Sequence, residues 1–264
     1  MLDTYAGASG AWSLRELSTA WAGLDVVRIV RSGGTEQDFT ASEITDGTLK
    51  TFCDAGVAPF TGKIVTWYDQ SGNTNDLSFV TSPTLYNGTS VVTENGEPAI
   101  DFVGATDEYG NVSSSNILTG ADFSVFAVAQ CDTNAVAYLV ATEGGGATGA
   151  RRSFYSHSLQ LGSAFKGSNT GTSLSTWDRT QSTISMIATD MQTSGSHTID
   201  TWVDGGSNSQ WTGTGLITPA TDNFRVGGET IWNGRIQEVV VYDSDETSNH
   251  AGIESNINTH YSIY

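Results

Sequence analysis

Short apolar or alternating segments, separated by clusters of glycine, asparagine, serine and threonine, follow one another along most of the chain. Apolar runs of about four to eight residues, bounded by such turn clusters, are typical of β-strands. Tight corners such as VDGGSN at 203–208 indicate antiparallel hairpins. We predict strands at 26–31, 63–68, 98–103, 123–130, 137–142, 153–162, 184–190, 198–205, 224–228 and 235–243.

Helical spacing is confined to three short segments. The segment 13–22 has a serine that can cap a helix, and its apolar residues recur near the helical period. The segment 45–52 predicts a second short helix. Ile253, Ile257 and Tyr261 lie four residues apart, which predicts a closing helix packed on a sheet. The fold class is therefore all-β: an antiparallel two-sheet β-sandwich with short N-terminal and C-terminal helices.

The chain reads as one unit of structure. It contains no internal repeat, no proline-rich linker and no heptad array. We predict a single domain over 1–264, in which residues 1–80 form an N-terminal extension integral to the same core.

The charge balance excludes two classes of partner. Eleven basic residues stand against 29 acidic ones, for a net charge of −18. Nucleic acid and anionic membrane surfaces both require clustered lysine and arginine, so neither is expected as a partner. The start, MLDTYAGASGAW, lacks the basic residues and apolar run of a secretory signal, so we expect synthesis and folding in a cytoplasm.

The two cysteines, Cys53 and Cys131, lie far apart in the sequence and have no metal-binding spacing. We predict that both stay unpaired and that folding requires neither a metal ion nor a cofactor.

Several motifs resemble a known family. The segments FSVFAVAQ, VDG and GRIQEVVVYD, followed by a helix, resemble the laminin-G and concanavalin A-like lectin class. The segments AWSLRELSTAWAGLDVVRIVRSGGTEQDF, TFC, TWYDQSGNTNDL and NGEPAIDF resemble the catalytic-domain family of α-L-arabinofuranosidase B. They resemble even more closely the copies of that module in bacteriophage virion proteins. The resemblance is strongest over 11–77 and implies a concanavalin A-like sandwich, or jelly roll.

The polar corner in WYDQSGNTNDL has two interpretations. Asp69, Ser71 and Asn73 are turn formers whose side chains bond nearby backbone amides, and Gly72 can supply a positive φ. The alternative is a calcium ion held by oxygen atoms of Asp69, Asn73, Asn75 and Asp76. The stretch lacks the spacing of an EF-hand, so a structural turn is favoured.

The resemblance also bears on catalysis. A retaining glycosidase uses two carboxyl groups about 5 Å apart. The stretch 150–162, which matches the family's nucleophile motif, contains no glutamate or aspartate, and Ser153 or a close neighbour stands in that place. Glu229 matches the family's general acid. Cys53 matches one cysteine of a loop disulfide whose partner is missing here, and the family's adjacent pocket cysteines are missing too. One carboxyl group cannot run a double displacement, so we predict a protein that is not an enzyme.

Other catalytic schemes find little support. The four histidines have no metal-ligand spacing, and no G-x-S-x-G elbow occurs. The glycine-rich segment 142–152 lacks the Lys-Ser/Thr ending of a phosphate loop. Its Arg151 and Arg152 are rare positive charges that could hold an acidic sugar or a neighbouring subunit.

We predict a non-catalytic structural or adhesion protein on a bacteriophage virion surface, as a head decoration, fibre or tail component, with a weak carbohydrate site. Its expected partners are other virion subunits in a homo-oligomer and bacterial surface polysaccharide. Sugar binding needs exposed aromatic faces beside amides and carboxylates. The candidates are Trp232 with Glu229 and Asn233, then Trp211, Trp177, Arg151 and Arg152. The alternatives are a purely structural virion protein and an active glycoside hydrolase of arabinofuranosidase type.

Overall fold

The computed structural model describes most of the chain. The described residues are 1–104, 108–112, 117–118, 120–133, 136–142, 151–157, 160–166, 172–176, 180–189, 196–206, 209–214, 223–228 and 232–264.

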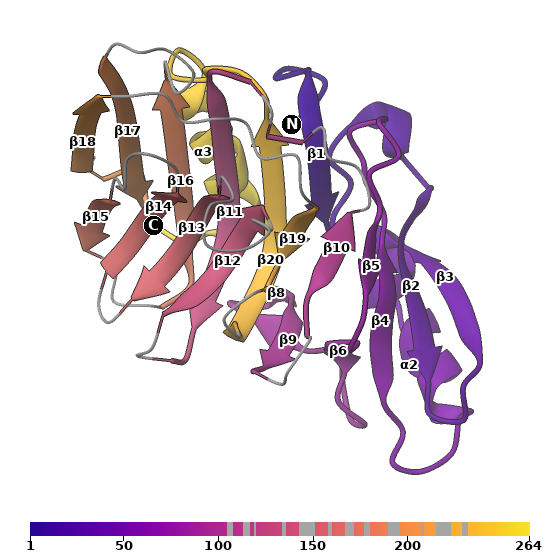
Figure 1. Ribbon diagram of the computed structural model, residues 1–264. Helices are drawn as coiled ribbons and strands as arrows, with labels where there is room; N and C mark the ends of the chain where they lie inside the picture. Colours follow the sequence, from indigo (N-terminus) through magenta and orange to yellow (C-terminus); the bar gives the residue numbers. More distant parts are fainter. Residues whose placement is uncertain are drawn as a thin grey trace.

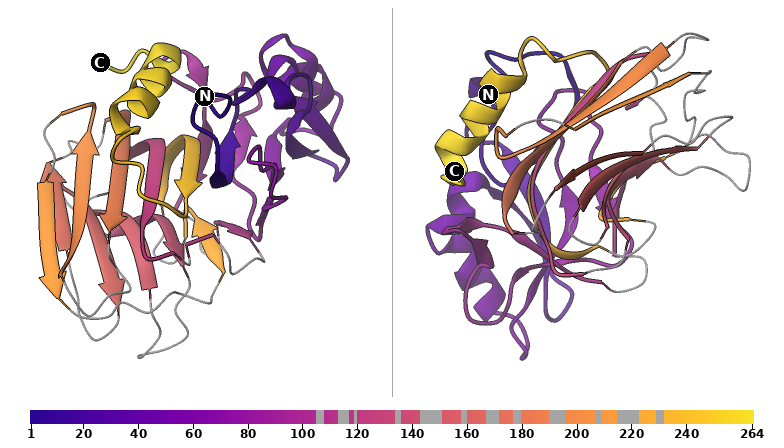
Figure 2. Two further views of the ribbon diagram at one scale, coloured as in Figure 1. Left: turned by 90° about the horizontal axis from the view of Figure 1, so that it is seen from above. Right: turned by 90° about the vertical axis from the view of Figure 1, so that its left-hand side faces the viewer.

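Two layers of antiparallel strands face each other (Figures 1 and 2). The order of strands in the first layer is β18 (Ser209–Thr214), β17 (Ser196–Val203), β16 (Ser182–Thr189), β11 (Phe123–Cys131), β20 (Asn233–Tyr242) and β1 (Ala8–Ser13). The order in the second is β15 (Thr172–Thr176), β14 (Gln160–Lys166), β13 (Arg151–His157), β12 (Ala137–Thr142), β19 (Phe224–Val226), β10 (Gly110–Val112), β5 (Leu77–Phe79), β4 (Gly62–Trp67), β2 (Asp25–Arg31) and β3 (Glu36–Thr40).

Two short strands join the layers. β9 (Ile100–Val103) pairs with β20, and β6 (Thr84–Tyr86) pairs with both β9 and β4. A separate hairpin, β7 (Thr93–Glu94) and β8 (Glu97–Pro98), precedes β9. Every described pairing of strands is antiparallel, so the predicted fold class, an all-β sandwich, is confirmed.

The first layer is buried on both of its faces. Val239 and Val241 of β20 point into the core between the layers, whereas Val240 and Tyr242 point into a second cluster beneath α3 (His250–Tyr261). A continuous apolar run such as VVVY is the expected sequence of a strand covered on both sides. Figure 2 shows α3 lying across the outer face of this layer. The predicted C-terminal helix is confirmed, with its three predicted apolar residues buried.

The predicted helix at 13–22 is wrong. The chain leaves β1 in an extended form, and only a 3₁₀ turn, η1 (Thr19–Trp21), follows. The Gln70 side chain supplies the reason: its amide donates to the carbonyl oxygens of Ser13 and Arg15 at 3.0 and 2.9 Å and accepts from the Leu17 N–H at 2.8 Å. These backbone groups are satisfied from outside, so local helical spacing does not decide the structure.

Two other predicted elements differ in their bounds. In place of a helix at 45–52, two short helices form, α1 (Ala41–Thr45) and α2 (Thr48–Asp54). Gly47 divides them because it adopts φ +98°, a left-handed conformation that a helix interior does not contain. The predicted strand at 153–162 is two strands, β13 and β14, paired as a hairpin.

The cysteines agree with the prediction that they stay unpaired, because Cys53 and Cys131 are both buried thiols. Burial, with the nearby Asp54 carboxylate, raises the pKa of the Cys53 thiol to about 11.

We therefore predict that both thiols react slowly in the native protein, because the thiolate is the reactive form and Cys53 stays protonated at neutral pH. Titration with a thiol reagent after denaturation without reductant should find two thiols per chain. A count of none would mean that the cysteines pair, and rapid native reaction at Cys53 would contradict the burial of its thiol.

Candidate functional site

The polar corner after β4, residues 69–76, connects the second layer to β1 through hydrogen bonds. The Asp69 carboxylate accepts four hydrogen bonds, from the backbone N–H groups of Ala11, Ser71 and Asn75 and from the Ser71 hydroxyl, at 2.7–2.9 Å. Gly72 adopts φ +88°, as the predicted turn requires. The Asn73 and Asn75 side chains donate to backbone carbonyls of Ala8 and Ser9. The predicted structural turn is confirmed by these hydrogen bonds.

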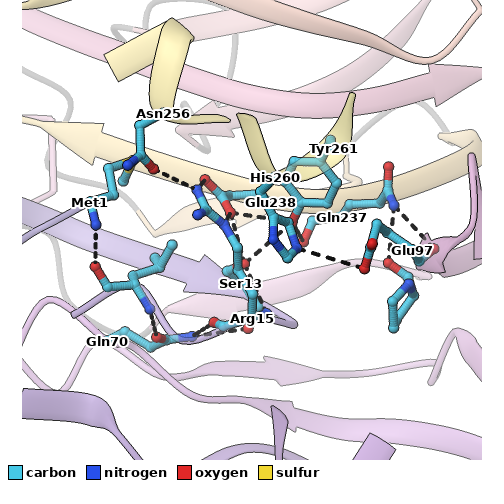
Figure 3. Close-up of polar contacts among 12 residues, drawn as sticks. Met1, Ser13, Arg15, Gln70, Glu97, Gln237, Glu238, Asn256, His260 and Tyr261 are labelled. Carbon is cyan, nitrogen blue, oxygen red and sulfur yellow. Dashed lines mark hydrogen bonds and ion pairs between the residues drawn. The ribbon is translucent and has the colours of Figure 1, made fainter. Parts of the chain in front are cut away.

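A buried ion pair between Arg15, just after β1, and Glu238 of β20 lies close to this corner (Figure 3). Arg15 Nε and Nη2 donate to the two carboxylate oxygens of Glu238 at 2.7 and 3.0 Å. The Glu238 side chain is 0% exposed and that of Arg15 is 14% exposed. Ser13 Oγ and Tyr261 Oη also donate to Glu238, at 2.8 and 3.2 Å. Arg15 Nη2 reaches Asn256 of α3 at 3.1 Å, so the pair joins β1, β20 and α3.

A β-bulge in β20 aims the neighbouring side chain in another direction. β11 pairs Val128 with Glu238 and then Ala129 with Ile236, which leaves Gln237 as the extra residue. The Gln237 amide donates to three backbone carbonyls at 3.1–3.2 Å, those of Glu94, Glu97 and Pro98. The bulge thereby fixes the β7–β8 hairpin beside the ion pair.

The charges in this cluster shift one another's pKa values. Burial opposes ionisation of Glu238, but the Arg15 guanidinium and the Ser13 hydroxyl outweigh it and hold the pKa of Glu238 below its ordinary value. Burial, and then the Glu238 carboxylate, raise the pKa of Tyr261 well above its usual range. Burial lowers the pKa of His260, and Arg15 adds to this effect. The cluster at neutral pH is therefore one ion pair with a neutral histidine and a neutral tyrosine.

An open cavity of about 440 Å³ lies beside this cluster. It is lined by Leu14, Arg15, Glu16, Ala41, Ser42, Thr45, Glu97, Pro98, His260 and Tyr261. Among the lining residues, His260 Nε2 lies 3.7 Å from a carboxylate oxygen of Glu97. The cavity thus offers hydroxyl, carboxylate, imidazole and guanidinium groups to a ligand.

A second polar surface covers the outer face of the second layer. Val112, Phe224 and Val226 of β10 and β19 point into the core, so Asn111 and Arg225 between them lie on the opposite face. The two are paired across the strands. The Arg225 guanidinium lies over the Tyr109 ring, 4.3 Å from its centre, and Asn111 Oδ1 has no hydrogen-bond partner among the described residues.

The strand register extends this outer row in one direction. Arg225 is opposite Ala141 of β12, and Ala141 is opposite Ser153 of β13. Ser153 is the position that the sequence matched to a family nucleophile. Asn111 and Arg225 therefore lie in the same cross-strand row as that position.

A serine, a histidine and a glutamate meet beneath α3, but they do not form a catalytic triad. Ser185 Oγ lies 2.8 Å from His250 Nε2 and 2.9 Å from Glu254 Oε1. A triad needs the carboxylate on the other ring nitrogen, yet Glu254 approaches the same Nε2 atom at 3.3 Å. Ser185 is also fully buried. These residues hold α3 on the sheet.

Comparison with known proteins gives a result at the level of structure. No protein-family model and no curated protein sequence matches the chain. The chain has an arabinofuranosidase-like β-sandwich fold. A GH54 α-L-arabinofuranosidase soaked with a cyclic sulfate inhibitor superposes with a TM-score of 0.68 at 16% identity, covering 95% of this chain and 62% of that one. An arabinofuranosidase complexed with arabinofuranosyl-α-1,2-xylobiose gives 0.65 at 19% identity, covering 94% and 62%.

A further similar structure is the binding domain of Paraclostridial Mosquitocidal Protein 1, with a TM-score of 0.54 at 12% identity over 74% of this chain and 49% of that one. The chain spans about three fifths of the length of the two arabinofuranosidases. The predicted resemblance to the arabinofuranosidase family is thereby confirmed for the fold.

The prediction that the protein is not an enzyme is corrected by these matches. Three structures that share its fold over 94–95% of the chain are those of arabinofuranosidases, which are glycoside hydrolases. The prediction rested on one stretch, 150–162, having no carboxylate. The absence of a carboxylate from this one stretch does not exclude catalytic carboxyl groups on other strands or loops of the same face. Catalytic groups often lie on loops.

The structure places the predicted sugar-binding residues in different environments. Trp232 was the first candidate, and this prediction is wrong: its side chain is 0% exposed in the core between the layers, so its ring offers no face to a sugar. Asn233 begins β20, where it pairs with Val103. Arg151 and Arg152 begin β13, and Trp211 lies in β18, but their side chains are outside the described part, as are all of Glu229 and Trp177.

The sequence carried three signals for the groups that it failed to predict. Glu238 interrupts the apolar run of β20, and a charge in a strand buried on both faces requires a buried partner. Arg15 is one of only eleven basic residues. For Arg225, the signal was the polar position between Phe224 and Val226, since alternation places it on the outer face.

Clusters of metal-binding side chains and helices long enough to span a membrane are both absent from the described residues. No group of three or more His, Cys, Asp or Glu side chains is arranged to hold a metal ion there. No helix in the same part of the chain has the length and apolar character needed to cross a membrane.

We predict that Glu238 governs part of the acid stability. Its pKa is lowered in the folded state, so its contribution is complete above the unfolded value of about 4.3 and is lost as pH falls through the folded value. The lowered pKa of His260 adds an earlier loss of stability, which begins as pH falls below about 6.5, since the unfolded chain binds that proton first.

Glu238→Gln should lower the free energy of unfolding at pH 7 by about 3–5 kcal/mol, because it leaves the Arg15 charge buried without its partner. Denaturant unfolding between pH 7 and pH 3 should show a shallower acid slope below about pH 4.5 in this variant than in the wild type. Glu36→Gln, at an exposed position of β3, is the control and should follow the wild type. Parallel curves for the wild type and Glu238→Gln would contradict the role of the ion pair.

Proposed function

We propose that this chain is a carbohydrate-active domain of the glycoside hydrolase type, which cleaves arabinofuranosyl groups from a glycan. The observation that carries the proposal is the likeness to arabinofuranosidases over 94–95% of the chain, with TM-scores of 0.65–0.68. One of those enzymes is complexed with an arabinofuranosyl-substituted xylobiose, which supports a substituted polysaccharide as the substrate class.

The outer face of the second layer is the proposed site of hydrolysis. The cluster of Tyr109, Asn111 and Arg225 supplies a ring, a partly exposed amide side chain and a guanidinium group. These are the groups that bind sugar rings and hydroxyls. A partly exposed Arg225 held over Tyr109 is already placed for such contacts, which limits the entropy lost on binding.

The chemistry requires two carboxyl groups, and we assign them to Glu229 and Glu108. Glu229 matches the family's general acid in sequence. Gly228, the residue before it, packs so closely on Tyr109 that an added Cβ would lie 2.8 Å from the tyrosine Cβ. Glu108 precedes Tyr109, is buried, and holds its carboxylate by accepting from the Val103 N–H at 2.7 Å. Gly228 and Tyr109, which neighbour the two glutamates in the sequence, are therefore packed against each other.

In this scheme Glu229 protonates the leaving oxygen and Glu108 acts as the base or nucleophile. Glycosidases use such a carboxyl pair either to activate water or to form a covalent intermediate. The choice between the two outcomes depends on the separation of the carboxyl groups, and the stereochemistry of the product reports it.

The predicted place on a phage particle, the virion subunits and bacterial polysaccharide as partners, and the homo-oligomer remain predictions from sequence. They are compatible with a hydrolase domain, since the proposal concerns only the chemistry of one face.

The expected result is that the wild-type chain hydrolyses 4-nitrophenyl α-L-arabinofuranoside and that Glu229→Gln and Glu108→Gln each lower kcat by about 100-fold or more. The control, Glu36→Gln, should keep the wild-type rate because its side chain is exposed on β3, remote from the cluster in the strand order. Thermal unfolding should show that each variant is folded.

No release of nitrophenol by the folded wild type, across aryl arabinofuranosides and arabinofuranosyl-substituted xylan, would overturn the proposal. Unchanged turnover in Glu229→Gln would overturn the assignment of the acid.

A further inference from the structure

We propose that a groove on the α3 side of the molecule binds a neutral glycan chain, as a second carbohydrate site separate from the outer face of the second layer. The choice of a glycan rests partly on the proposed function, since a hydrolase of substituted polysaccharides benefits from holding the chain at a second point.

Two adjoining cavities form the groove. The 440 Å³ cavity beside the ion pair shares Thr45 and Pro98 with a second cavity of about 360 Å³. The second is lined by Ile44, Thr45, Gly47, Lys50, Thr89, Ser90, Val91, Thr93, Gly96 and Pro98. The groove therefore runs from the C-terminal end of α3, past α1 and the β7–β8 hairpin, to the start of α2. Two open cavities that adjoin at Thr45 and Pro98 offer room for more than one linked sugar.

The walls of the groove are fixed before any ligand binds. The ion pair with Glu238 holds Arg15, and Gln237 holds the β7–β8 hairpin through three backbone carbonyls. A capping box fixes the start of α1: the Thr40 side chain accepts from the Glu43 N–H, and the Glu43 carboxylate accepts from the Thr40 N–H. Such preorganisation lowers the cost of binding.

The side chains that line the groove favour a ligand rich in hydroxyl groups over an ionic or a purely apolar ligand. Ser42, Thr45, Thr89, Ser90 and Thr93 are hydroxyl residues, and all five are partly or fully exposed. The floor is apolar and contains Leu14, Ile44, Val91 and Pro98. A sugar presents the same combination of hydroxyl edges and an apolar face.

The net charge of the groove favours a neutral glycan over an acidic one. The Arg15 charge is balanced by Glu238, and Lys50 is paired with Asp54 at 2.6 Å. Glu16 and Glu97 add two negative charges, while the lowered pKa of His260 leaves it neutral at pH 7. The groove is thus net negative, which disfavours uronic acids and other anions.

The test uses the whole chain and four hexasaccharides: xylohexaose, α-1,5-arabinohexaose, mannohexaose and hexagalacturonate. Calorimetry measures affinity, and amide shifts in NMR spectra locate the site. We expect at least one neutral hexasaccharide to bind, with shifts at Thr45 and Thr93, and hexagalacturonate to bind more weakly. Ser42→Tyr places a ring in the groove and should weaken binding by about tenfold or more.

Ser255→Tyr is the matched control, because Ser255 is an exposed serine on α3 away from both cavities, and it should bind within about twofold of the wild type. Thr93→Tyr blocks the other cavity and provides a second test if Ser42→Tyr fails to fold. Absence of groove shifts with every neutral hexasaccharide, tighter binding of hexagalacturonate, or equal affinity in the folded blocking variants overturns the inference.

Hydrolysis is measured separately on the wild type with the aryl arabinofuranoside. Turnover without groove binding overturns the second site alone. Groove binding without turnover leaves the second site standing and overturns the proposed hydrolysis.

Discussion

The ion pair between Arg15 and Glu238 is the interaction on which the arrangement of both chain ends depends. It joins a residue just after β1 to one near the middle of β20, and its hydrogen bonds reach α3 through Tyr261 and Asn256. Taking two charges out of water costs several kcal/mol for each ion, which only close contacts can offset. Glu238 receives four hydrogen bonds and Arg15 receives a bidentate partner, so the geometry meets that requirement.

This constraint also shapes the surface. Glu238 faces α3. The bulge directs the side chain of the preceding residue, Gln237, toward the β7–β8 hairpin, and its hydrogen bonds fix the hairpin. The groove lies between these fixed elements. The outer face of the second layer is built differently, because strand alternation places the partly exposed Asn111 and Arg225 opposite a continuous core. The two surfaces have separate structural origins, so a change in one need not disturb the other.

Much of the fold was predictable from local pattern, because strands with buried faces need apolar residues at fixed positions. The run VVVY in β20 and the spacing of Ile253, Ile257 and Tyr261 specify their elements correctly. The segment 13–22 was not predictable in this way, since Gln70, more than fifty residues away, satisfies its backbone groups. Apolar spacing there reflects burial of Leu14 and Leu17 in an extended chain.

The candidate site was harder to predict than the fold. Trp232 follows a glycine-rich polar stretch in the sequence, but its ring is buried in the core between the layers. Aromatic residues stabilise cores more often than they bind ligands, and local composition does not separate the two roles. Arg225 and Asn111 come from strands more than a hundred residues apart, so only the strand register brings them together. The missing carboxylate at 150–162 was a correct observation, yet that stretch covers only β13 and the start of β14, and other strands contribute to the same face.

The most direct test of the central claim is a double-mutant cycle on the ion pair, with Arg15→Met, Glu238→Leu and the double variant measured by denaturant unfolding at pH 7. Each single variant should lose about 3–5 kcal/mol, because each leaves a buried group without its partner. The double variant should lose less than the sum by about 2–3 kcal/mol or more, which is the coupling expected of residues in direct contact. Losses that add to within about 0.5 kcal/mol would show that the two residues act independently and would contradict the account.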